Sequence, residues 1–124
     1  MGDIEELLSE DVYKRQLLSL GSMALLSIDT DDPEAAKQIN EAYVREAIAF
    51  YGEAHVNTWG AVNNLGYIYD KLGDYQRALE CYAWVYERIQ QTGTKETLPK
   101  AVIMLDNMAQ TYKRLDVYKR QLQE

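Results

Sequence analysis

The chain has 124 residues, 47% of them hydrophobic and 27% charged, which suffices for one core or a short repeat array but not for two independent domains. A formal net charge of −7 opposes binding to nucleic acid or to an anionic membrane surface, and a single cysteine, Cys81, excludes an internal disulfide. The chain starts acidic and has no apolar stretch of about 20 residues, so we expect neither a secretory signal nor a membrane span, and a cytoplasmic location.

The first half of the chain predicts two helices. Residues 17–28 are apolar enough for one helix, although they fit the repeat described below poorly. Asp32 followed by Pro33 predicts the start of the next helix, because a carboxylate caps free N–H groups and proline is tolerated in the first turn. Apolar residues at helical spacing continue this helix to Phe50.

The second half predicts three more helices. Residues 56–72 carry one apolar stripe at three- and four-residue steps, and Gly73 ends it. Residues 75–91 repeat the pattern and stop at Gly93, because glycine takes left-handed dihedrals at low cost. A last helix is predicted to run over residues 97–115 or beyond.

An internal repeat relates the third and fifth predicted helices. An offset of 43 residues carries Asn64 onto Asn107, and the neighbouring apolar residues Val62, Leu65, Tyr69 and Leu72 recur as Leu105, Met108, Tyr112 and Leu115. A repeat of this length is typical of stacked helix pairs, each of which cannot bury its apolar face alone.

A second repeat is out of phase with the first. Residues 11–17 return unchanged as residues 116–122. The string DVYKRQ resembles a translated linker found at the ends of assembled metagenomic reads. We therefore expect an ill-defined lead over residues 1–16, a helical array over 17–115, and an artefactual tail over 116–124 that continues the last helix. The alternative is a coincidental pair of amphipathic helix ends.

The clearest units, residues 56–92 and 97–115, resemble the tetratricopeptide repeat family. Gly66 and Ala78 have the spacing of its motif, and an aromatic residue follows Ala78 four positions later. The matching repeat-core residues are Leu65, Gly66, Tyr69, Ala78, Tyr82, Met108, Ala109 and Tyr112. The repeat is longer than usual, with Val62 in place of the family's tryptophan and Gln90 in place of its proline, and so it is similar to the variety in kinesin light chains. The resemblance implies an all-α fold of about five helices, stacked as antiparallel hairpins in a short right-handed solenoid.

The resemblance also implies binding of a protein or an extended peptide in a concave groove. Carried over by position, the groove residues are Asn63, Asn64, Tyr67, Asp70, Lys71, Asp106, Asn107, Gln110, Lys113 and Arg114. The asparagine amides can pair with a ligand's backbone, and the cations can hold a carboxylate. The alternative for Asn64 and Asn107 is that they brace adjacent helices.

Other conspicuous residues indicate structure rather than catalysis. Trp59, Trp84 and Cys81 are expected to pack between helices, and His55 to cap a helix or face solvent. The sequence has no glycine-rich phosphate loop or paired-histidine metal motif, so we predict no enzyme activity, no cofactor and no metal.

Self-association is the competing function. A repeat array leaves one apolar face bare at each exposed end. In this chain, the residues expected to be bare on the last helix are Ile103, Met104, Met108 and Tyr112. We therefore expect a homodimer through an end of the array. The chain would then be a fragment of a larger bacterial scaffold, or the sensor half of a regulator.

Overall fold

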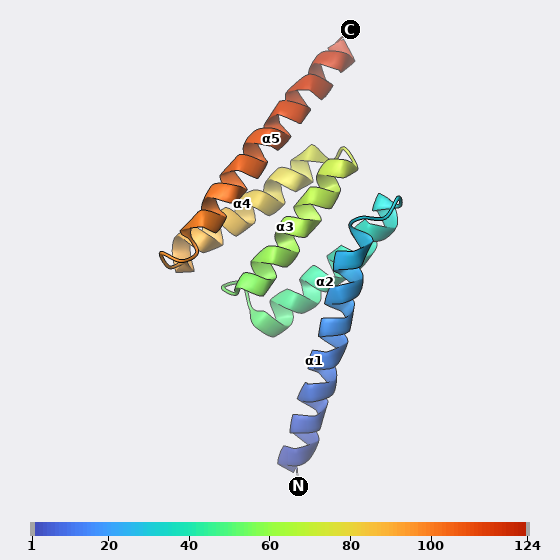
Figure 1. Cartoon of the computed structure of the whole chain (residues 1–124), viewed down its shortest axis with the longest axis vertical. Helices are drawn as coiled ribbons and strands as arrows, with labels where there is room; N and C mark the ends of the chain where they lie inside the picture. Colours follow the sequence, from blue (N-terminus) through green and yellow to red (C-terminus); the bar gives the residue numbers. More distant parts are fainter. Residues whose placement is uncertain (1, 124) are drawn as a thin grey trace.

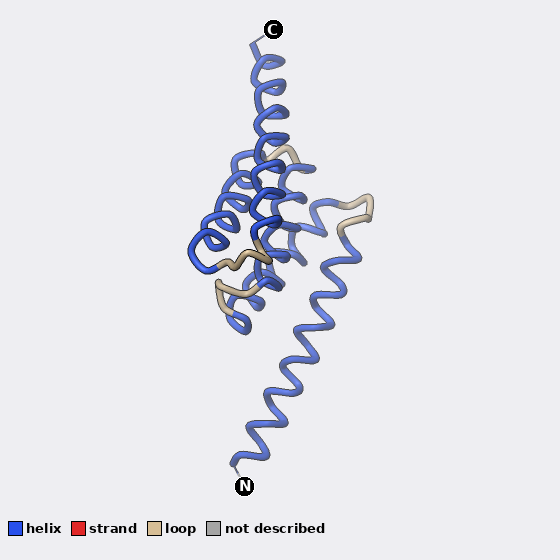
Figure 2. Tube along the Cα trace, turned by 60° about the vertical axis from the view of Figure 1, so that its left-hand side comes forward, coloured by secondary structure: helices blue, strands red, loops and turns tan. Residues whose placement is uncertain are grey.

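The computed structural model describes residues 2–123, which form five helices and no strand (Figures 1 and 2). The helices are α1 (Gly2–Ser27), α2 (Pro33–Tyr51), α3 (Val56–Lys71), α4 (Tyr75–Thr92) and α5 (Leu98–Gln123). Consecutive helices run in opposite directions, and each packs against the next along the chain (Figure 1). This confirms the predicted all-α stack of helical hairpins.

Side chains and turns set the helix ends. Asp32 Oδ1 accepts a hydrogen bond from the Ala35 amide at 3.1 Å, directly before Pro33 opens α2. His55 caps α3, because its Nδ1 accepts from the Asn57 amide at 3.0 Å. These contacts satisfy backbone donors that the first turn of a helix leaves free.

Two glycines end helices for different reasons. Gly73 was expected to end α3, and its φ of +80° is the left-handed conformation that glycine adopts at low cost. Gly93 was expected to be left-handed, and this is wrong, because its φ is −74° and its backbone is extended. At Gly93 the constraint is space. A Cβ there would lie 2.4 Å from the carbonyl oxygen of Ile89.

Helix α3 is buried on two faces, because it lies between α2 and α4. On the first face, the Thr58 hydroxyl donates to the Gly52 carbonyl at 2.7 Å. On the second face, Gly66 lies against the ring of Tyr82 in α4. At helical spacing, the first face consists of Thr58, Ala61, Leu65 and Ile68, and the second face of Trp59, Val62, Gly66 and Tyr69. All eight residues are buried.

Helix α5 repeats only one of these faces. Shifted by 43 residues, the first face becomes Ala101, Met104, Met108 and Thr111, which are buried or half-buried. The second face becomes Val102, Leu105, Ala109 and Tyr112, which are exposed. We predicted that Ala109 and Tyr112 belong to the core, and this is wrong because both are exposed. We also predicted that Met104 and Met108 are bare, and this is wrong because Met104 is buried and Met108 is half-buried. The reason is that α5 packs against α4 and has no following helix in the described chain.

Helix α1 belongs to a further unit of the array. An offset of 42 residues aligns Leu17, Ala24 and Ser27 with the second face of α3, and all three are buried against α2. The same offset aligns Ala36 and Asn40 of α2 with Ala78 and Tyr82 of α4, again at buried positions. Residues 17–28 fit the 43-residue frame poorly because the offset between α1 and α3 is 42 residues, one fewer than between α3 and α5.

The outer parts of α1 and α5 project beyond the stack (Figures 1 and 2). Residues 9–16 and 116–123 are exposed throughout, whereas Leu17 and Thr111 are buried. Tyr13 still reaches α2, because its ring lies 5.7 Å from that of Phe50. The burial boundaries lie close to the proposed limits of the array at residues 17 and 115, and the division itself stays a proposal.

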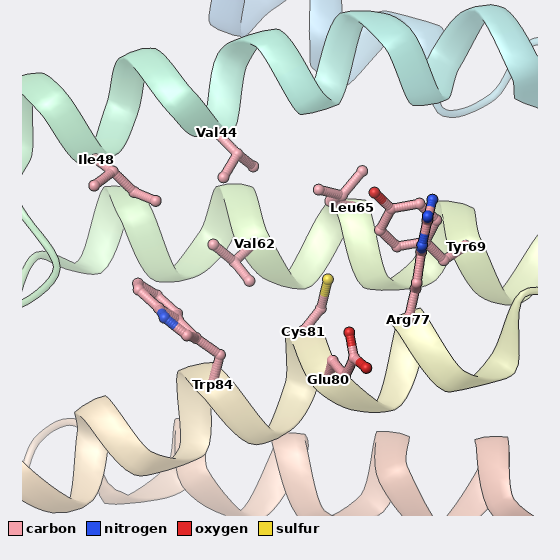
Figure 3. Close-up of a pocket in the computed structure, with 9 residues that line it drawn as sticks. All are labelled: Val44, Ile48, Val62, Leu65, Tyr69, Arg77, Glu80, Cys81 and Trp84. Atoms are coloured by element: carbon pink, nitrogen blue, oxygen red, sulfur yellow. The ribbon is translucent and has the colours of Figure 1, made fainter.

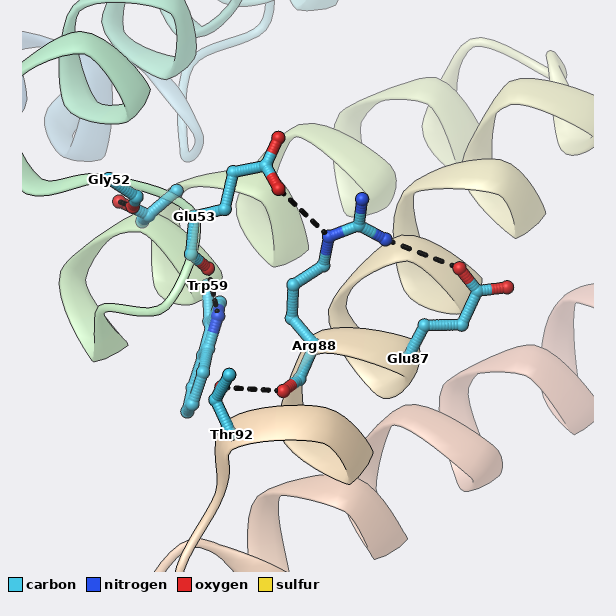
Figure 4. Close-up of polar contacts among 7 residues, drawn as sticks. Gly52, Glu53, Trp59, Glu87, Arg88 and Thr92 are labelled. Carbon is cyan, nitrogen blue, oxygen red and sulfur yellow. Dashed lines mark hydrogen bonds and ion pairs between the residues drawn. The ribbon is translucent and has the colours of Figure 1, made fainter.

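Polar contacts tie the α2–α3 turn to α4 (Figure 4). The Trp59 indole N–H donates to the Glu53 carbonyl at 2.7 Å. The Arg88 guanidinium lies 3.6 Å from the Glu53 carboxylate and 4.3 Å from the centroid of the Trp84 ring. The three helices around this corner are therefore fixed by directional contacts as well as by apolar packing.

The close approach of α3 and α4 gives a first prediction. In Gly66→Ala the new Cβ would lie 2.8 Å from the Tyr82 ring, so we expect a loss of about 1–3 kcal/mol of unfolding free energy. Gly60 on the same helix has nothing within 4 Å, so Gly60→Ala should instead add about 0.5–1 kcal/mol. Urea denaturation of both variants measures the difference. Equal effects would contradict the proposed role of Gly66.

Candidate functional site

Side chains link the odd-numbered helix α3 to the residue that follows α1 and to α5. Lys71 Nζ donates to the Ile28 carbonyl at the end of α1 at 3.4 Å. On the other side, Asn107 Nδ2 donates to Asn63 Oδ1 at 3.0 Å. We call the exposed side of these three helices, between their two packing faces, the odd-helix surface.

Asp70 is the polar centre of the contact between α3 and α5. Its side chain is 7% exposed, and its Oδ2 accepts from the Thr111 hydroxyl at 3.0 Å and forms an ion pair with Arg114. The carboxylate therefore has two partners at Oδ2, one of them a cation, as a buried charge requires. Asp70 and Arg114 were expected to face a ligand, whereas the structure uses them to join two helices.

Sequence reasoning missed Thr111. It is fully buried, and it occupies an apolar position of the repeat, equivalent to Ile68. A hydroxyl at such a position is a signal that could have been read, because buried hydroxyls need a partner.

The asparagine pair is partly a brace. The side-chain amide of Asn107 donates to Asn63. The repeat counterpart of Asn107 is not Asn63 but the next residue, Asn64. Asn64 is half-buried. The bracing alternative thus describes Asn63 and Asn107.

Tyr67 and Lys71 form an accessible part of the predicted site. Tyr67 is 46% exposed, and the Lys71 ammonium lies 4.9 Å from the centre of its ring. Together with Asp70 and Arg114 they line a cavity of about 310 Å³. An ammonium over an aromatic face is a favourable arrangement that also leaves the charge open to an anion.

The other predicted residues on α5 are more scattered. Asp106 and Gln110 are exposed and bonded to each other at 2.8 Å. Lys113 lines a neighbouring cavity of about 300 Å³ with Tyr75, Tyr118 and Arg114. Arg114 therefore lines both cavities, and Lys113 lies beside the group of Tyr67, Lys71 and Arg114 without lining the same cavity as Tyr67 and Lys71.

Helix α1 adds two residues that sequence reasoning missed. Leu18 and Leu25 are 54% and 60% exposed, and the 42-residue offset gives them the places of Gly60 and Tyr67 on the odd-helix surface. They were missed because residues 17–28 did not fit the 43-residue frame. The odd-helix surface is thus apolar along α1, aromatic and cationic along α3, and polar along α5.

A third cavity lies on the other side of α3, between α2 and α4 (Figure 3). Its volume is about 330 Å³, and most of its lining is apolar, including Val44, Val62 and Trp84. Burial raises the pKa of the Cys81 thiol to about 12, so this thiol stays neutral at physiological pH and is a poor nucleophile. With His55 engaged in capping α3, the only histidine and cysteine serve structural contacts.

Within residues 2–123, wherever side chains are described, no group of acidic, histidine or cysteine side chains is placed to hold a metal ion. No helix of the described chain is both long and apolar enough to cross a bilayer.

The Asp70 contact gives a second prediction. In Thr111→Val the carboxylate loses a buried donor without a change of shape, so we expect a loss of about 1–2 kcal/mol in unfolding free energy. Thr92→Val on α4 removes an exposed hydroxyl and should change stability by less than about 0.5 kcal/mol. Urea denaturation compares the two. Similar small effects would mean that the Thr111 hydroxyl contributes nothing to the contact between α3 and α5.

Comparison with known proteins agrees with the repeat. The family model described as "Tetratricopeptide repeat" matches residues 60–89, which span most of α3 and α4. Neither the curated proteins nor the solved structures gave a match. Tetratricopeptide repeats are helical hairpins that generally mediate protein–protein interactions. The match to the α3–α4 hairpin, in a stack of helical hairpins, supports a protein of the tetratricopeptide repeat family.

Proposed function

We propose that this chain binds an extended peptide or a segment of a partner protein on the odd-helix surface. The observation that carries the proposal is the exposed Tyr67 ring with Lys71 beside it, at the middle of three aligned helices. An aromatic ring that is half exposed on a rigid helix offers a large contact area at low entropic cost.

The surface indicates the chemistry of the ligand. Leu18 and Leu25 offer an apolar strip along α1, suited to an apolar side chain. Lys71 contacts a carbonyl and an aromatic ring, whereas the charge of Arg114 is already balanced by Asp70. A carboxylate of the ligand would therefore bind at Lys71, with an apolar side chain next to it on Tyr67.

The braces between α3 and α5 make this surface stiff. The Asn63–Asn107 and Asp70–Thr111 bonds fix the two helices relative to each other before any ligand arrives. Preorganisation of this kind lowers the entropic cost of binding. The four residues thus contribute to binding by positioning helices.

The third prediction tests this surface with peptides selected from a displayed random library on the purified full chain. For a selected peptide, Tyr67→Ala should weaken binding about tenfold or more, because the ring supplies the main apolar contact. Tyr118→Ala is the matched control, since Tyr118 is 47% exposed and lies on the projecting end of α5. Isothermal titration measures both. Unchanged affinity in Tyr67→Ala, for every selected peptide, would refute the proposed surface.

A second candidate function is self-association through an exposed end of the array. On α1, the 42-residue offset places Met23 and Leu26 in the first face, and they are 55% and 75% exposed. Burial of such side chains is worth about 1.5–3 kcal/mol each. Two copies joined by this face would hide it from water, and the chain would be a homodimer.

The fourth prediction is a light-scattering mass that rises with concentration from one chain toward two. At about 100 μM an association worth about 5.5 kcal/mol is half complete, so the average mass there should be midway between one and two chains. Leu26→Asp should return the mass to one chain, because a charge would be buried in the contact. Leu122→Asp, at a residue that is 68% exposed near the end of α5, should leave it unchanged. A mass of one chain for the unsubstituted protein would exclude the homodimer.

Finer assignments complete the proposal. Offsets of 42 and 43 residues between units support the longer-repeat variety similar to that of kinesin light chains. The exposure of both copies of DVYKRQ supports the proposal that these segments are foreign to the array. We propose further that the protein is cytoplasmic and acts as a bacterial scaffold or as the sensor half of a regulator. The binding surface proposed above does not depend on these assignments.

A further inference from the structure

The second face of α5 is an internal duplicate of a face that is covered elsewhere in the same molecule. In α3 this face is closed by α4, and Trp59, Val62 and Tyr69 are 4%, 5% and 8% exposed. In α5 the equivalent Val102, Leu105 and Tyr112 are 64%, 47% and 56% exposed. The second face of α5 therefore has side chains at the same positions as that of α3, and it differs in that no helix of the described chain covers it.

Helix α4 shows what kind of element covers such a face. It runs antiparallel to α3 and brings Ala78, Tyr82, Val85 and Ile89, all buried, to the contact. These residues follow three- and four-residue steps, so the covering element is an amphipathic helix with one apolar stripe. A second copy of the chain could offer only its outer helices α1 and α5, because α2, α3 and α4 already have neighbours on both sides. Pairing of two copies through this face is therefore the alternative that the measurement of mass must separate from binding of a foreign helix.

One difference between the two faces makes the fit selective. α5 has Ala109 where α3 has Gly66. A Cβ at Gly66 would lie 2.8 Å from Cε1 and 3.1 Å from Cζ of Tyr82, and also 3.1 Å from Cβ of Cys81. A helix that covers α5 in the geometry of α4 must therefore lack the ring atoms at the residue equivalent to Tyr82, and it must shift by a few tenths of an ångström at the residue equivalent to Cys81.

We propose that the second face of α5 binds an amphipathic helix from another protein, similar to α4 but with a shorter aliphatic side chain where α4 has Tyr82. This site lies on a different side of α5 from the odd-helix surface. Its test is therefore independent of the test of peptide binding on the odd-helix surface.

The fifth prediction uses two fluorescent peptides with the sequence of residues 74–92, one natural and one with Tyr82→Leu. Leucine keeps an apolar side chain but has no atoms in place of Cε1 and Cζ. The full chain should bind the Tyr82→Leu peptide about tenfold more tightly than the natural peptide, measured by fluorescence anisotropy. In the Ala109→Gly chain the order should reverse, because the space for the ring is restored.

Adjacent residues provide the matched control. Val102→Asp should abolish binding, whereas Ile103→Asp should not change it, because Ile103 is 52% exposed but belongs to neither packing face. Equal loss in both variants, equal affinity of both chains for both peptides, or no binding of either peptide would overturn the proposal. A chain of double mass that Val102→Asp alone returns to single mass would show a second copy on this face, and would also overturn it.

Discussion

The structure depends on the sharing of apolar faces between neighbouring helices. No single hairpin of this chain buries its own apolar residues, and α3 is buried only because α2 covers one face and α4 the other. Gly66 is a point of close contact in this sharing, since the absence of a side chain lets the Tyr82 ring approach the helix backbone. Apolar burial supplies the free energy, and the small residue sets the geometry in which it is gained.

Most of the fold could be predicted because its causes are local. Apolar residues at helical spacing, the Asp32 cap and the positive φ of Gly73 all act within a few residues of each other. Prediction failed where the cause was distant or missing. Ala109 and Tyr112 carry the same pattern as Gly66 and Tyr69, but no sequence pattern tells whether a covering helix is present.

The candidate site was less predictable than the fold. The residue types on the odd-helix surface were identified, yet a position in a repeat does not separate a ligand contact from a contact between helices. Asp70 faces Thr111 and Arg114 because α5 lies alongside α3 within the described chain. Lys71, one residue later, points at Tyr67 and stays accessible. Such neighbouring residues differ in role through the direction of one side chain.

The linear order of contacts has a consequence for motion. Each inner helix packs against two neighbours along the chain, whereas α1 and α5 each pack against one and have only a few polar contacts with α3 in addition. In an array with only nearest-neighbour coupling, the outermost elements open first and at the lowest free energy. Amide protons in α3 should therefore exchange with solvent last, and fraying should proceed inward from both termini. Tyr67, at the centre of the odd-helix surface, thus lies on the helix that opens least often.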